Sequence, residues 1–138
     1  MLSTDSGPRR ARGFPARAVA LALVAAALAA CAAGPTGPPV TAEPGSPTIA
    51  ANDLKFDRTG LDVPAGRSFT LVFDNRESAV HNVAIYSDQN ATVALYKGEL
   101  FSGPSVRVYA VPQLAPGTYH FRCDVHLQMV GSVVARAP

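Results

Sequence analysis

The sequence predicts an all-β domain, a single β-sandwich, preceded by an export signal and a proline-rich tether. Three observations predict this organisation: a basic segment followed by an apolar run, a stretch in which half the residues are proline or glycine, and then short runs rich in Val, Ile, Phe, Tyr and Thr separated by turn residues. These short runs lack a sustained 3.6-residue period, so helices are not expected in the domain. A chain of 138 residues has room for one such domain.

Residues 1–30 resemble an export signal. Four arginines precede the run "AVALALVAAALAA" at residues 18–30, which contains no polar side chain. This run is shorter than the roughly 20 residues that a membrane-spanning helix needs, and a basic segment before a short apolar run is typical of a cleaved signal. We therefore expect an extracytoplasmic protein.

The apolar run ends in "LAAC", residues 28–31, which resembles the lipobox of bacterial lipoproteins. The resemblance implies cleavage before Cys31 and acylation of its thiol, so that a lipid anchors the protein in the cell membrane. The alternative is an ordinary small-residue cleavage site followed by an incidental cysteine.

Residues 31–47 form the second predicted region, the lipidated Cys31 and a flexible linker rich in proline and glycine. Such a composition favours extended, polyproline-like conformations and leaves no apolar period to bury. Once residues 1–30 are removed, the formal charge of +2 disappears, because eight basic and nine acidic side chains remain. No basic cluster survives, so nucleic-acid binding is not expected.

Residues 48–138 form the predicted domain. "VPAG" (63–66), "DNRES" (74–78) and "LAPG" (114–117) are turn signals. The region 87–104 fits either a short strand or a helical turn. The expected strands are residues 49–56, 61–63, 67–74, 79–86, 105–111, 117–123 and 131–136.

Strand alternation places two chemistry-bearing residues on the inner face of the predicted sandwich. His81 shares its parity with Val83 and Ile85, and Cys123 shares its parity with Phe121. His81 begins one strand and Cys123 ends another. If these strands run antiparallel, the two residues meet at one pole of the sandwich.

Cys123, His126 and Met129 follow one another at intervals of three residues. If Cys31 is acylated, Cys123 is a lone thiol in an exported protein, and three explanations compete: an inert buried cysteine, a catalytic thiol activated by a histidine, or a metal ligand. With His81, the set provides two imidazoles, one thiolate and one thioether, which is the donor set of a blue copper site. Zinc has little use for a thioether and fits this set less well.

The domain resembles the cupredoxins of the plastocyanin, amicyanin and halocyanin group. The motifs that carry the resemblance are "VPAGRSFTLVFDN" (63–75), "HN" (81–82) and "GTYHFRCDVHLQMVG" (117–131). It implies a Greek-key β-sandwich that binds one type 1 copper ion through His81, Cys123, His126 and Met129. It further implies that Asn82 forms hydrogen bonds near the cysteine and braces the ligand loop. Many relatives have proline after the second histidine, where this chain has Leu127.

This resemblance implies an electron carrier, not an enzyme, that cycles one copper ion between Cu(I) and Cu(II). We expect a monomer whose redox partner proteins dock transiently near His126, where Val125 and Leu127 flank the ligand. A copper-binding protein for delivery or storage would use the same ligands and is the alternative function. A β-sandwich lipoprotein without metal, used for adhesion or assembly, is the third.

Overall fold

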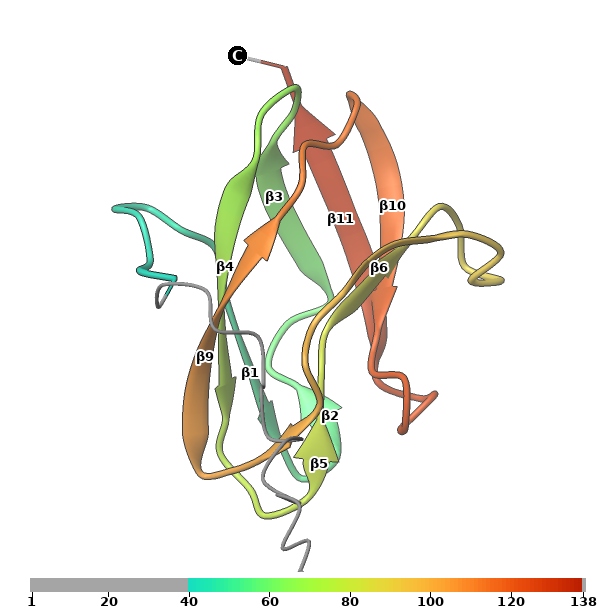
Figure 1. Ribbon diagram of the computed structural model, residues 1–138. Helices are drawn as coiled ribbons and strands as arrows, with labels where there is room; N and C mark the ends of the chain where they lie inside the picture. Colours follow the sequence, from blue (N-terminus) through green and yellow to red (C-terminus); the bar gives the residue numbers. More distant parts are fainter. Residues whose placement is uncertain (1–39, 138) are drawn as a thin grey trace, which may run out of the picture. The chain divides into compact units, whose positions relative to one another are not determined.

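The computed structural model describes residues 40–137, and these residues form β-strands and connecting loops (Figure 1). The predicted signal peptide and Cys31 lie outside the described residues. Within residues 40–137, no helix has the length and hydropathy needed to cross a membrane. The strands are β1 (Thr48–Asn52), β2 (Lys55–Phe56), β3 (Gly60–Pro64), β4 (Phe69–Asn75), β5 (Val80–His81), β6 (Ala84–Tyr86), β7 (Ala94–Lys97), β8 (Phe101–Ser102), β9 (Ser105–Val111), β10 (Gly117–Arg122) and β11 (Val130–Arg136).

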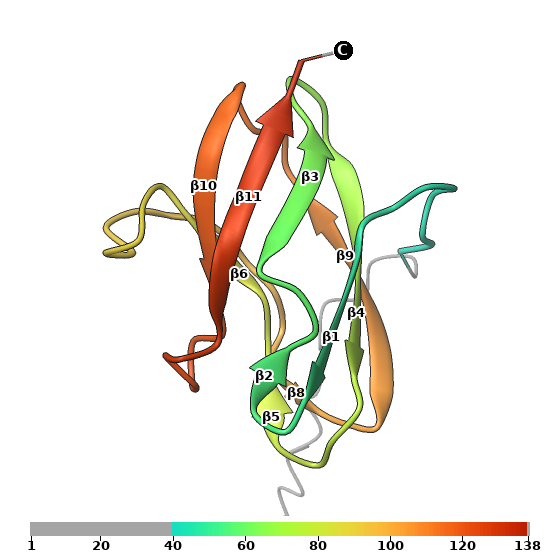
Figure 2. The same cartoon turned by 180° about the vertical axis from the view of Figure 1, so that it is seen from behind.

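Two main sheets face each other. One has the strand order β2-β1-β4-β9 and the other β3-β11-β10-β6-β7, with β5 and β8 forming a separate pair. Figures 1 and 2 show the two layers from opposite sides. Strands β1 and β4, and likewise β3 and β11, pair in parallel, while the remaining pairs are antiparallel. The predicted all-β sandwich is confirmed.

The core lies between the two sheets and is rich in aromatic side chains. Leu71 and Phe73 of β4 and Phe121 of β10 are fully buried. The ring centroids of Phe56 and Phe121 lie 5.4 Å apart, as do those of Phe73 and Phe101. Each large apolar side chain removed from water contributes about 1.5–3 kcal/mol. This packing reaches the donor residues, because Phe101 pairs with His81 and Phe121 lies two residues before Cys123.

The single strand predicted at residues 49–56 is wrong, because the chain reverses within it. β1 and β2 form an antiparallel hairpin in which Asn52 pairs with Lys55. Asp53 and Leu54 between them have φ values of 53° and 55°. Two consecutive left-handed residues form the tight hairpin turn whose twist matches that of its strands.

The single strand predicted at residues 79–86 is also wrong. β5 pairs with β8, whereas β6 pairs with β10 and β7. The chain therefore changes pairing partners after His81, and Asn82 and Val83 between the two strands belong to neither. The open question about residues 87–104 is resolved in favour of strands, because β7 and β8 lie there. The other predicted strands agree with the observed bounds within two residues.

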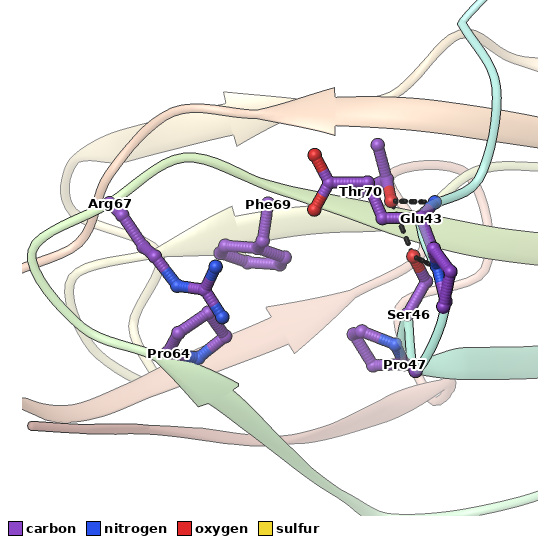
Figure 3. A pocket seen from close by; sticks show the side chains of 9 residues that line it. Glu43, Ser46, Pro47, Pro64, Arg67, Phe69 and Thr70 are labelled. Carbon is purple, nitrogen blue, oxygen red and sulfur yellow. Dashed lines mark hydrogen bonds between the residues drawn. The ribbon is translucent and has the colours of Figure 1, made fainter. Parts of the chain in front are cut away.

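The last residues before β1 contact the sandwich. Glu43 and Ser46 form a turn in which the Ser46 N–H donates to the Glu43 carbonyl at 3.0 Å. The Glu43 N–H donates to Thr70 Oγ1 at 3.1 Å, and the Ser46 and Thr70 hydroxyls are hydrogen-bonded to each other. Figure 3 shows this turn beside a small cleft that Arg67 and Phe69 also line. The chain is therefore held against β4 from Glu43 onward.

Candidate metal centre

Three donor residues meet at one pole of the sandwich because of the strand pairing. β10 runs antiparallel to β6, with Phe121 opposite Ile85 and Arg122 opposite Ala84. His81 ends β5, shortly before β6, and Cys123 directly follows β10. The start of one segment thus lies beside the end of the other, the arrangement expected from strand parity. His126 lies on the loop between β10 and β11.

The donor atoms of His81, Cys123 and His126 form a compact triangle. Cys123 Sγ lies 3.7 Å from His81 Nδ1 and 3.8 Å from His126 Nδ1, and the two Nδ1 atoms are 3.1 Å apart. A point equidistant from all three lies about 2.1 Å from each, close to the ~2.0–2.3 Å at which a first-row metal ion binds imidazole nitrogen and thiolate sulfur. The three donors therefore fit one metal ion.

Met129 is placed by the hydrogen bonds of the ligand loop. The Cys123 N–H donates to the Met129 carbonyl at 3.0 Å, and the Met129 N–H donates to the His126 carbonyl at 2.9 Å. The Met129 side chain is 2% exposed and belongs to the same core cluster as Cys123. The loop thus folds back on itself and keeps the thioether in the apolar interior near the thiol.

Glu77 orients His81, and sequence analysis did not identify it. Glu77 Oε1 lies 2.8 Å from His81 Nε2 and also accepts the Leu54 N–H at 2.9 Å. The Leu54 N–H and the His81 imidazole lower the pKa of the Glu77 carboxyl. A carboxylate can only accept, so Nε2 carries the imidazole proton and Nδ1 has its lone pair free for a metal. The only sequence signal was an acid four residues before the histidine, in a predicted turn.

Asn82 is buried and connects the ligand loop to the strands behind it. Its Nδ2 donates to the Gly98 carbonyl at 3.0 Å and to Asp124 Oδ2 at 3.1 Å. Its Oδ1 accepts the Asp124 N–H at 2.9 Å. These bonds join Asn82 to the residue directly after Cys123, so they restrain the cysteine at the chain position next to it.

The centre is buried except at His126. His81 and Cys123 are fully buried, whereas His126 is partly exposed. Val125 and Leu127, on either side of it, are 49% and 62% exposed. His120, the remaining histidine of residues 40–137, is partly buried in β10 and lies outside the donor cluster. The imidazole of His126 is thus the donor group nearest to solvent, and two exposed apolar side chains flank it.

Two imidazoles and a thiolate in a buried triangle, with a thioether nearby, suit copper in both of its oxidation states. Thiolate and thioether sulfur favour Cu(I), and imidazole binds both Cu(I) and Cu(II). The fold and this donor set define a mononuclear blue copper protein.

Comparison with known proteins identifies the family. Residues 18–135 match the family described as a cupredoxin-like domain, and the chain belongs to this family. Amicyanin-alpha of Methylorubrum extorquens is 34% identical over 123 residues, which cover 86% of this chain and 97% of that protein. The predicted family, the copper cofactor and the class of electron carrier rather than enzyme are confirmed.

Solved structures show the same fold. Auracyanin from Roseiflexus castenholzii has a TM-score of 0.59 at 21% identity and covers 70% of this chain and 99% of its own. Auracyanin A from Chloroflexus aurantiacus has a TM-score of 0.58 at 22% identity, covering 66% and 98%. A point mutant of amicyanin in its reduced Cu(I) form has a TM-score of 0.51 at 26% identity, covering 67% and 83%.

Proposed function

We propose that this protein carries single electrons between extracytoplasmic partner proteins, and that a lipid on Cys31 holds it at the cell membrane. The observation that supports this proposal best is the buried triangle of His81 Nδ1, Cys123 Sγ and His126 Nδ1, whose atoms all lie within 4.8 Å of one another. Auracyanin A is a "blue" copper protein, and amicyanin has been solved in reduced and oxidised forms.

His81, Cys123 and His126 would hold the copper ion, and Met129 would offer its thioether as a weaker donor. Bound copper would supply the redox chemistry by changing between Cu(I) and Cu(II). The protein restrains the ligands through Glu77 at His81 and through the loop bonds of Cys123 and Met129. Because the ligands are already fixed, little rearrangement accompanies the arrival or loss of an electron.

Electrons would enter and leave through the imidazole of His126. It is the ligand nearest to solvent, and the exposed side chains of Val125 and Leu127 surround it with apolar surface. A small apolar patch suits brief docking with a redox partner rather than a permanent complex.

The proposed lipid anchor has its own test. Residues 32–42 precede the turn that is held against β4, and a segment of this composition could span up to roughly 34 Å at about 3.1 Å per residue, enough to keep the domain clear of a membrane surface. In cells supplied with a labelled fatty acid, the unmodified chain is expected to incorporate the label and the Cys31→Ser variant to lose it. Absence of the label from the unmodified chain would contradict the anchor.

Electron transfer and copper delivery are separated by what happens on reduction. Voltammetry of the copper-loaded protein is expected to give one reversible one-electron wave, with copper retained over many cycles in the presence of a Cu(I) chelator. Release of Cu(I) to the chelator on each reduction would contradict the carrier function and favour copper delivery.

A further inference from the structure

Asp124 directly follows Cys123, and its carboxylate is bonded through both oxygens. Tyr86 Oη donates to Oδ1 at 2.5 Å, and Asn82 Nδ2 donates to Oδ2 at 3.1 Å. The Asp124 side chain is only 18% exposed. Both oxygens accept hydrogen bonds, which is the pattern of an ionised carboxylate. The Asp124 carboxylate is therefore part of the hydrogen-bonded structure around the donor residues and is not a solvated surface group.

Two cations form ion pairs with this carboxylate. Lys97 Nζ is 3.6 Å from Oδ2, and Arg122 Nε is 3.8 Å from Oδ1. The Lys97 side chain is 56% exposed, so water screens much of its charge. Both cations also lie over the Tyr86 ring, with centroid distances of 5.6 Å for Lys97 and 4.7 Å for Arg122. The carboxylate thus balances these cations, and its loss would leave both positive charges without this anionic partner.

The position of this charge is fixed relative to the thiolate. The Asp124 N–H donates to Asn82 Oδ1 at 2.9 Å while the Asp124 side chain accepts from Asn82 Nδ2, so backbone and side chain are both held. Tyr86 belongs to β6, which pairs directly with β10. Asp124 therefore connects the loop directly after Cys123 to strand β6.

We propose that Asp124 is a positioning residue of the copper site whose fixed negative charge stabilises Cu(II) relative to Cu(I) and lowers the reduction potential. The inference rests on the proposed electron-transfer function and adds a residue that sets the reduction potential of the copper ion. Cu(II) carries one more positive charge than Cu(I), so a nearby anion in a largely buried setting favours the oxidised ion. The hydrogen bonds determine where this charge lies.

Asp124→Asn removes the charge at nearly constant volume. Its equilibrium between Cu(II) and Cu(I) is expected to shift about tenfold toward Cu(I), which raises the reduction potential of a one-electron couple by ~59 mV. Asp124→Glu keeps the charge and is expected to restore most of the original potential. Asp62→Asn is the matched control, because Asp62 is 69% exposed and pairs with Arg136. Voltammetry of the copper-loaded full chain measures all three variants.

Tyr86→Phe provides a second test with the opposite sign. It keeps the carboxylate and removes one donor, so the negative charge is less neutralised and the reduction potential is expected to fall. Circular dichroism of the metal-free protein shows whether Asp124→Asn folds. If it does not fold, the reduction potential of Tyr86→Phe alone tests the effect of the Asp124 charge. If Asp124 had only a structural role, there would be no reason for Asp124→Asn and Tyr86→Phe to shift the reduction potential in opposite directions.

The inference is overturned if Asp124→Asn changes the potential no more than Asp62→Asn does, or if Tyr86→Phe raises the potential. Failure of the proposed function can be told apart from failure of this inference, because it would already be seen in the voltammetry of the unsubstituted protein. An unsubstituted chain that shows no reversible copper wave overturns both proposals before any variant is compared.

Discussion

Glu77 Oε1 lies 2.8 Å from His81 Nε2, so a carboxylate supports the imidazole that ends β5. The same oxygen accepts the N–H of Leu54 in the turn between β1 and β2. A hairpin turn and a histidine proposed to bind copper, distant in the sequence, therefore share one acceptor. The orientation of His81 depends on the β1–β2 hairpin as well as on its own strand.

Glu77→Gln tests this support. The glutamine oxygen can still accept a hydrogen bond, but the charge that strengthens the imidazole as a donor is lost. The affinity for Cu(II) is expected to fall about 10–100-fold, the usual effect of losing a partner of a metal-binding histidine. Competition titration measures it. Glu99→Gln is the control, because Glu99 is 72% exposed and 4.0 Å from Arg107. Equal affinities of the two variants would exclude the role assigned to Glu77.

The rate of electron self-exchange tests whether electrons pass through the surface around His126. Leu127 is 62% exposed beside His126, and exchange requires two such surfaces to approach each other. Leu127→Glu is expected to slow self-exchange at least about tenfold, because two like charges would meet across the contact. Nuclear magnetic resonance line broadening in mixtures of reduced and oxidised protein gives the rate.

Val106→Glu is the matched control for this experiment. Val106 is 52% exposed in β9, and the substitution adds the same charge to another surface. Its self-exchange rate is expected to stay within about twofold of the original at moderate ionic strength. Equal slowing by the two substitutions would mean that net charge, and not contact at His126, governs the rate.

Met129→Leu separates the packing role of the Met129 side chain from the role of its thioether sulfur as a donor to copper. Met129 is 2% exposed, and leucine has a similar volume, so the stability of the metal-free protein is expected to change by less than about 1.5 kcal/mol. The reduction potential is expected to rise, because the axial ligand tunes it and leucine offers no donor to Cu(II). Urea unfolding and voltammetry measure the two effects. An unchanged potential would show that the thioether does not act on the metal.

Gly131 is needed for the close approach of β11 to Phe121. A Cβ at this position would overlap the edge of the Phe121 ring and lie 2.6 Å from the Thr59 carbonyl oxygen. Gly131→Ala is therefore expected to destabilise the metal-free protein by about 1–3 kcal/mol through overpacking. Gly60→Ala is the control, because nothing lies within 4 Å of its Cβ position. Similar urea midpoints for the two variants would contradict this close packing.

Much of the fold follows from alternation and turn residues, but two strand breaks could not be predicted. Leu54 takes a left-handed conformation that apolar residues rarely adopt, so the turn after Asn52 carries no usual signal at that position. The break after His81 occurs where the chain changes partners from β8 to β10. Because buried residues continue through it, an apolar pattern alone does not reveal a change of sheet.

The donor residues could be expected from the sequence, and the family resemblance also implied the bracing role of Asn82, but the contributions of Glu77 and Asp124 could not be expected. Cys123 and His81 stand at strand ends with inward parity, and antiparallel pairing then brings them together. Glu77 and Asp124 give no comparable signal, since acids in turns and loops are normally solvated. Their roles depend on partners far along the chain, such as Leu54 and Tyr86, and only the folded structure shows these contacts.

The most direct test of the copper site is spectroscopic. One equivalent of Cu(II) is added to the metal-free full chain and to its Cys123→Ser variant, and visible absorption and electron paramagnetic resonance spectra are recorded. We expect an intense thiolate-to-copper charge-transfer band and narrow copper hyperfine splitting in the unsubstituted protein, both lost in the variant. Colourless samples with the same ordinary Cu(II) signals in both proteins would contradict a copper site built on Cys123.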